Sequence, residues 1–144
     1  MTEDIGWLVG VDWASTEHQV CLMDATGEVM EEHAFPHSGT GLDRLCRWLL
    51  QTTRAKAGSI AVAIEVPHGP VVETLLERGF VVYAINPKQL DRFRDRFTLP
   101  GSKDDRLDAR VLAEALRSDR PRQKSSPCAR SHAWSRICSR SAPA

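Results

Sequence analysis

Residues 7–35 have the sequence WLVGVDWASTEHQVCLMDATGEVMEEHAF and contain three short apolar segments separated by turn residues. Residues 7–12 form an apolar run that ends in an acid, which is typical of a strand buried on both faces. Residues 18–23 and 29–35 are predicted as the next two strands, and Asp24-Ala25-Thr26-Gly27 has the length and composition of a hairpin turn. The segment therefore predicts a three-stranded antiparallel meander.

The chain after this meander alternates between helix and strand signals. Strands are predicted over residues 60–65 and 80–85, and helices over residues 38–53, 68–78, 86–97 and within 101–116. A strand that is reached through a helix normally runs parallel to a strand already in the sheet. The expected fold is therefore α/β, with a mixed five-stranded sheet of three antiparallel strands followed by two parallel ones, and with flanking helices.

Composition indicates one domain followed by a different kind of tail. Residues 1–116 carry 12 Lys and Arg against 18 Asp and Glu, and residues 117–144 carry 7 against 1, so opposite charges cancel in the total. Residues 119–144 are rich in Ser, Arg and Pro and lack a sustained apolar period, which predicts a disordered tail. The expected domain therefore spans residues 1–118.

Several other classes of protein are disfavoured by simple patterns. The four cysteines lack C-x-x-C spacing, which argues against a zinc site or a disulfide framework. No apolar run approaches the roughly 18 residues of a membrane span. The first ten residues lack the basic and apolar regions of a signal peptide, so a cytoplasmic location is expected.

Four acids are candidates for a metal site. Asp12 and Glu65 each end an apolar strand, and ligand sites of open α/β sheets lie at the carboxyl ends of the strands. Asp105 and Asp108 are three apart on a predicted helix and share one of its sides. Together they could hold two divalent ions roughly 4 Å apart, which suits phosphodiester chemistry. Two simpler interpretations remain open: strand-end acids in wet loops, and helix capping by Asp104 or Asp105.

A basic line on the helix predicted over residues 86–97 is a candidate nucleic-acid contact. Lys88, Arg92 and Arg96 recur every four residues and could follow a phosphate backbone. The alternative is a solvated face on which Asp91 and Asp95 are the ion partners.

Four segments together resemble a known protein family. They are GVDWASTEHQVCLMDATGEV (residues 10–29), AIEVPHG (63–69), ERGFVVYAINPKQL (77–90) and SKDDRLDARVLAEAL (102–116). They are similar to the N-terminal domain of the DEDD transposases of IS110 insertion sequences, which are RuvC-like (RNase H-like) recombinases guided by a bridge RNA. The resemblance covers about residues 5–118.

The resemblance implies a role for each of the four acids. The family's G-[IV]-D acid matches Asp12, and its glutamate after the fourth strand matches Glu65. Its K-x-D-x-x-D-A pattern matches residues 103–109, which makes Asp105 and Asp108 the last two ligands and leaves Asp104 at the variable position. The implied activity is Mg²⁺-dependent DNA cleavage and strand transfer. The implied partners are DNA, a guide RNA, and further copies or a full-length transposase.

The chain departs from the family after about residue 118. Family members continue through a coiled coil into a domain whose serine also takes part in cleavage, and residues 119–144 do not resemble that continuation. Truncation or a frameshift would explain the difference, and full recombination is then not expected. A non-catalytic nucleic-acid-binding fragment is the main alternative. An actin-like ATPase is disfavoured because Trp13-Ala14-Ser15-Thr16 lacks the glycine of a phosphate-binding turn.

Overall fold

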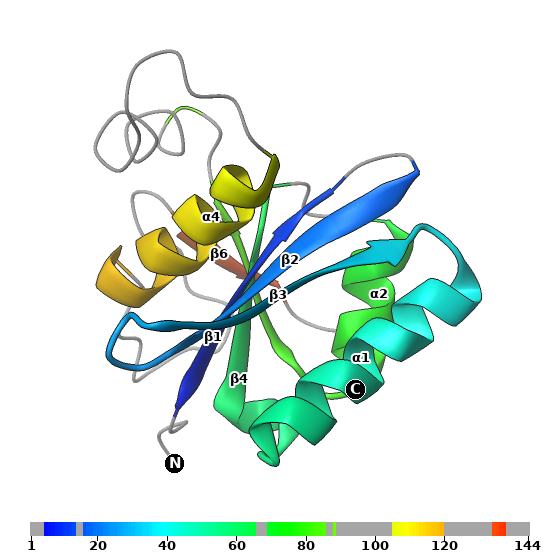
Figure 1. Cartoon of the computed structure of the whole chain (residues 1–144), viewed down its shortest axis with the longest axis horizontal. Helices are drawn as coiled ribbons and strands as arrows, with labels where there is room; N and C mark the ends of the chain where they lie inside the picture. The colour runs from blue at the N-terminus through cyan, green and yellow to red at the C-terminus, as the bar shows by residue number, and fades with distance from the viewer. Residues whose placement is uncertain are drawn as a thin grey trace, which may run out of the picture.

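A computed structural model describes residues 5–13, 16–65, 69–85, 88, 105–119 and 134–137. These residues form a sheet with helices on both faces (Figure 1). The strands are β1 (Trp7–Asp12), β2 (Glu17–Asp24), β3 (Val29–Pro36), β4 (Ile60–Ile64), β5 (Val81–Ile85) and β6 (Trp134–Ile137). The helices are α1 (Gly39–Thr53), α2 (Pro70–Glu77) and α4 (Asp105–Asp119), with a 3-10 turn η1 (Ala57–Ser59).

The sheet has the predicted mixed topology. Its strand order is β3-β2-β1-β4-β5-β6. The first three strands are antiparallel neighbours, and β4 and β5 run parallel to β1. The expected arrangement of three antiparallel strands followed by two parallel ones is therefore confirmed.

A sixth strand corrects the expectation of a disordered tail for four of its residues. β6 pairs antiparallel with β5, and Val82 lies opposite Ile137 and Ile85 opposite Trp134. An unpaired edge of β5 would leave backbone N–H and C=O groups without partners, and a short strand supplies them whatever its side chains are. The apolar period of the sequence gives no sign of such a strand. The domain boundary near residue 118 stays a prediction.

Local sequence signals explain the first turn and the first helix. The carboxylate of Asp24 accepts hydrogen bonds from the backbone N–H of Thr26 at 2.9 Å and of Glu28 at 3.0 Å. Gly27 supplies the left-handed backbone that closes this hairpin, with φ of 97°. Ser38 caps α1, because its hydroxyl accepts from the backbone N–H of Gly41 at 3.0 Å.

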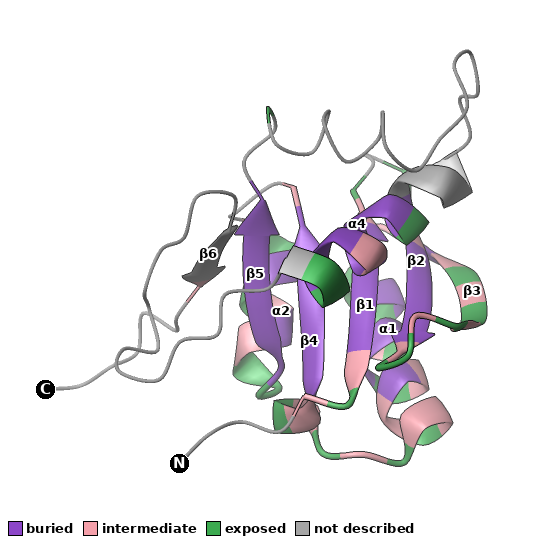
Figure 2. Ribbon diagram, turned by 90° about the vertical axis from the view of Figure 1, so that its left-hand side faces the viewer, coloured by how far each residue is buried: buried purple, intermediate pink, exposed green. Residues whose placement is uncertain are grey.

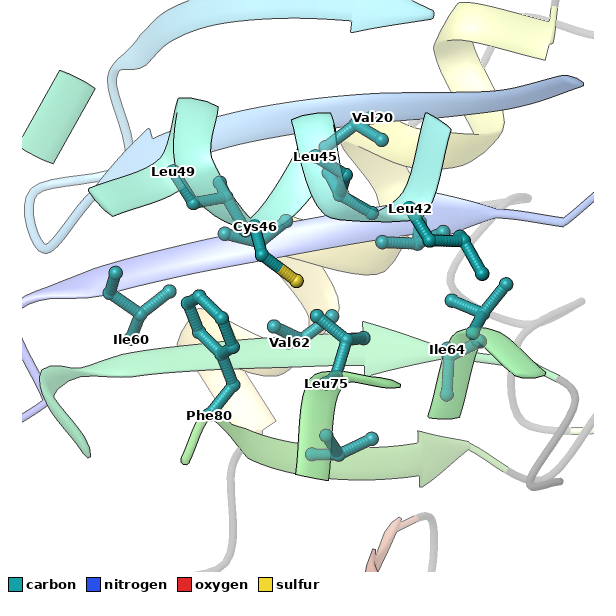
Figure 3. Close-up of a cluster of buried hydrophobic side chains, with 14 of the residues drawn as sticks. Val20, Leu42, Leu45, Cys46, Leu49, Ile60, Val62, Ile64, Leu75 and Phe80 are labelled. Carbon is teal, nitrogen blue, oxygen red and sulfur yellow. The ribbon is translucent and has the colours of Figure 1, made fainter. Parts of the chain in front are cut away.

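Two apolar layers hold the helices on the sheet. α1 and α2 cover one face, where Leu45 and Leu49 pack toward the β4 side chains Ile60 and Val62 (Figure 3). α4 covers the other face and contributes Leu112 and Leu116, among other residues, to its core. Figure 2 shows that α4 crosses the sheet in front of β1, with α1 and α2 behind. The strands β1, β2, β4 and β5 therefore divide their side chains between two separate cores.

The core between α4 and the sheet is narrow where α4 crosses β1, because the residues there are small. A Cβ atom on Gly10 would lie 1.9 Å from the carbonyl oxygen of Ala109 and 2.8 Å from the backbone nitrogen of Ala113. On the adjacent strand β4, the side chains in this core are the small ones of Ala61 and Ala63. Small residues thus let the backbone of α4 rest directly on β1.

Among the described residues, no helix has both the length and the apolar character that a membrane crossing requires.

Candidate active site

Asp12 and Glu65 lie at the carboxyl ends of β1 and β4, which are neighbouring strands in the middle of the sheet. β1 and β4 are parallel, and their last recorded pair is Val11 with Ile64. Asp12 is the last residue of β1 and Glu65 is the first residue after β4, and both are half-buried. The register of the two strands therefore brings residues 12 and 65 to the same end of the sheet.

Alternation along β1 assigns Asp12 to the face covered by α4. Leu8 belongs to the α4 core and Gly10 contacts α4, whereas Val9 and Val11 belong to the opposite core. Asp12 continues the series of Leu8 and Gly10. On β4, Ala61 and Ala63 belong to the α4 core, and Glu65 is the first residue after the strand ends.

The direction of α4 brings its first turn to the same end of the sheet. Ala109 rests on Gly10, two residues before Asp12. Arg117, two turns later, lies against Gly27 in the turn at the opposite end, where Asp24 pairs with Trp7. α4 therefore runs antiparallel to β1 and begins at the carboxyl end of that strand, as Figure 2 also shows.

The two predicted helical ligands are the first and fourth residues of α4. Asp105 opens the helix and Asp108 precedes Ala109, which contacts β1. Their side chains, and the whole of Asp104, lie outside the described residues. Within the described part of the chain, no group of three or more His, Cys, Asp or Glu side chains could hold a metal ion. The side chains of two of the four predicted ligands, Asp105 and Asp108, lie outside that part.

An ion pair fixes α4 across the sheet. The guanidinium of Arg110 donates to both carboxylate oxygens of Glu32 on β3, at 2.7 and 2.8 Å. Bidentate geometry restricts the rotation of both side chains and so favours one position of the helix. Arg110 lies two residues after Asp108, so this contact is close to the first turn of α4.

An aromatic cluster beside Asp12 was not predicted from the sequence. His18 is fully buried, and its Nε2 lies 2.9 Å from Nδ1 of His37. The ring of Trp13 lies 6.1 Å from that of His18 and 6.0 Å from that of His37, measured between centroids. The histidines are nineteen residues apart, and only the pairing of β2 with β3 brings them together. The sequence signal that could have pointed here is the large aromatic residue directly after the first acid.

The predicted basic line lies almost entirely outside the described residues. Lys88 is described and exposed. Arg92 and Arg96 fall outside the described part of the chain, so their relation to the acids stays a prediction.

Comparison with known proteins gives related sequences over most of the chain. The protein y4uE of Sinorhizobium fredii, named as a transposase, is 58% identical over 120 residues, which are 83% of this chain and 33% of that protein. The mini-circle protein for IS117 of Streptomyces coelicolor, also named as a transposase, is 37% identical over 110 residues, which are 76% of this chain and 27% of that protein. The chain thus spans about a third or less of the curated relatives it matches.

Structural comparison returns a solved structure of T. thermophilus RuvC in complex with a Holliday junction substrate. The two chains superpose with a TM-score of 0.48 and 17% sequence identity, over 75% of this chain and 90% of that one.

A family model described as the transposase of IS110 elements with a DEDD motif matches residues 9–135. That match extends from β1 into β6 and includes all four predicted acids. The chain belongs to the DEDD transposase family of IS110 insertion sequences.

Proposed function

We propose that this chain is a catalytic domain for DNA transposition, in which Asp12, Glu65, Asp105 and Asp108 bind divalent metal, with two Mg²⁺ ions at the DNA phosphate. The observation that supports the proposal is the parallel register of β1 and β4, whose last pair, Val11 with Ile64, directly precedes Asp12 and Glu65. The start of α4 at the same end of the sheet supports a contribution from Asp105 and Asp108.

The donor set suits a hard cation. All four proposed ligands are carboxylates, and Mg²⁺ prefers oxygen ligands and keeps some of its waters and phosphate contacts. Four carboxylates at one place repel each other, and a bound cation removes that cost. The half-buried state of Asp12 and Glu65 makes the repulsion stronger than at an open surface.

The four proposed ligands come in two pairs, one from the ends of two strands and one from the first turn of α4. Asp12 ends β1 and Glu65 directly follows β4, and both strands are paired on both sides, so these acids would provide the rigid half of the site. Asp105 and Asp108 would provide the other half from α4, which Gly10 and the Arg110–Glu32 pair keep close to the sheet. When bound, Mg²⁺ supplies polarisation of the phosphodiester and activation of the attacking oxygen.

DNA is the proposed substrate, and a guide RNA and further transposase copies are the proposed partners. The family assignment supports DNA as the substrate. The line of Lys88, Arg92 and Arg96 would contact the nucleic-acid backbone, and the exposure of Lys88 is compatible with that role. Replacing these three residues with Gln should weaken DNA and RNA binding alike and reduce the salt dependence.

Metal titration of single variants tests the proposal. Binding of Mn²⁺ should be strongly reduced in Asp12→Asn, Glu65→Gln and Asp105→Asn, and Asp104→Asn should bind as the wild type does. Without metal, Asp12→Asn should be more stable than the wild type, because one repelling charge is removed. Glu31→Gln, which changes an exposed acid of β3, is the matched control for that comparison.

Nicking of supercoiled DNA is the second measurement. The wild type should nick weakly with Mg²⁺ or Mn²⁺ and not with Ca²⁺, and each ligand variant should lose that activity. Equal Mn²⁺ affinity in Asp104→Asn and Asp105→Asn would contradict the ligand assignment. Nucleic-acid binding without any metal binding would instead favour a non-catalytic fragment.

A further inference from the structure

We infer that Trp13 is a stacking platform for an unpaired nucleobase next to the phosphate held by the acids. The inference rests on the proposed function, because it takes the carboxyl ends of β1 and β4 as the place where a nucleic-acid strand passes.

Trp13 occupies a defined position at the sheet edge. It directly follows Asp12, so its Cα lies about 3.8 Å from that of the first acid. A strand whose phosphate is bound at Asp12 therefore carries a neighbouring base within reach of the indole. Strand alternation assigns Asp12 to the α4 face, whereas His18, which Trp13 contacts, is in series with Val20 and Leu22 of the opposite core. The phosphate would thus contact the α4 side at the end of β1, and the base would contact Trp13 on the opposite side.

The indole is supported by a fixed pair of imidazoles. His18 is fully buried and lies within hydrogen-bond distance of His37, at 2.9 Å. The backbone N–H of His37 donates to the carbonyl oxygen of Thr16 at 2.9 Å, which ties the pair to the start of β2. Both rings contact Trp13 at about 6 Å. Because the two imidazoles already restrict the motion of the indole, binding a partner costs little conformational entropy, which favours affinity.

The exposure of Trp13 is more than its packing role requires. The residue is 41% exposed, and among the described residues the other exposed large hydrophobic side chain is Met30, at 47%. Met30 lies at the start of β3, at the end of the sheet opposite to Asp12. A side chain that only shields His18 could be any apolar one, whereas stacking requires an aromatic ring with an open surface.

The net negative charge of residues 1–116 makes base stacking on Trp13 a useful contribution to strand binding. Residues 1–116 carry six more acidic than basic side chains, so the body attracts a phosphate backbone weakly. Base–aromatic stacking is independent of charge and stabilises binding by about 1–3 kcal/mol per base. The ring would hold the strand where the carboxylates alone would repel it.

Binding of single-stranded oligonucleotides that contain 2-aminopurine tests the inference, with Ca²⁺ in place of Mg²⁺ and with matched DNA and RNA. We expect Trp13→Leu to weaken binding about tenfold and to abolish the quenching of 2-aminopurine by stacking. Trp13→Phe should retain most of both signals, and Met30→Leu should leave both unchanged. The DNA and RNA arms show which strand supplies the base.

Three outcomes would overturn the inference. They are unchanged affinity and quenching in Trp13→Leu, equal losses in Met30→Leu, and no binding of single strands by the wild type. If Trp13→Leu fails to fold, Trp13→Phe decides: a modest loss of affinity and quenching supports stacking, and values equal to those of the wild type overturn it. Titration of the same samples with Mn²⁺ separates the two proposals, because Trp13→Leu should keep the metal affinity of the wild type whether or not stacking occurs.

Discussion

His18 is the residue whose burial has the clearest consequence for stability. Burial, followed by the charge of nearby His37, lowers the pKa of His18 from 6.5 to about 4. The unfolded chain therefore takes up a proton near pH 6.5, and the folded chain takes it up only near pH 4. Stability from this residue is complete above the unfolded pKa and is lost as the pH falls toward 4.

We predict that the free energy of unfolding falls by about 3 kcal/mol through this residue between neutral pH and pH 4. Urea unfolding at several pH values measures the loss. The variant His18→Asn should be less stable at neutral pH, and its stability should depend less on pH across this window. Equal pH slopes in the two proteins would show that His18 is not the group responsible.

Residue patterns in the sequence predict that Asp12 and Glu65 follow neighbouring parallel strands, and the structure has both residues at the carboxyl ends of β1 and β4. The joint role of the two carboxylates stays a prediction. The contact of Trp13 with His18 and His37 could not be anticipated, because it depends on the exact pairing of β2 with β3. No spacing rule links residues that meet across antiparallel strands at a loop.

At the scale of elements, the seating of α4 on β1 determines where half of the proposed site lies. The helix is held by apolar residues along its length, but its distance from the sheet is set at Gly10, where a Cβ would collide with backbone atoms. Backbone cannot move aside as a flexible side chain can. A change at this glycine should therefore shift the helix as a whole.

We predict that Gly10→Ala lowers the free energy of unfolding by about 1–3 kcal/mol, through overpacking beneath α4. Its Mn²⁺ affinity should fall as well, because Asp105 and Asp108 would move with the helix. Gly58→Ala is the matched control, since a Cβ on Gly58 would meet nothing within 4 Å. Urea unfolding and metal titration of both variants provide the measurement. Loss of stability with unchanged metal affinity would contradict a ligand role for α4.

Elements with a strong local signal were predicted well, and those without one were not. The cap at Ser38, the turn at Asp24 and the apolar strands all have causes within a few residues of sequence. β6 has none, because an edge strand of four residues gains its stability from the backbone of β5. Its residues contain no apolar alternation to detect, so the sequence favoured a disordered tail.

For the whole molecule, the cores on the two faces of the sheet differ in the size of their residues and in what they contribute. The core under α1 and α2 is built from large aliphatic side chains, including Leu45 and Leu75. The core under α4 includes small residues at the crossing with β1 and β4, such as Ala63 and Ala113. The first core can supply most of the apolar burial, and the second brings a helix close to the strand ends that carry the acids.

The order of strands also determines which edges need protection. β3 is one edge of the sheet, and it carries exposed Glu31 and ends at Pro36, which discourage further pairing. β5 is the other edge of the five-stranded core, and all five of its residues, Val81–Ile85, are buried. A strand of that composition would be a site of aggregation if β6 did not cover it.

We therefore predict that a chain ending at Asp119 still folds but is less stable by about 2 kcal/mol, the net contribution of a few hydrogen bonds between β5 and β6. It should also self-associate through the uncovered edge of β5. Urea unfolding and sedimentation velocity measure the two effects.

Ser135→Pro in the full chain is the control, because proline removes a backbone donor from β6 opposite Ala84 without deleting the tail. That variant should show a smaller loss in the same direction. If the shortened chain is as stable and as monomeric as the full one, β6 contributes nothing to the domain, and a boundary near residue 118 describes it better.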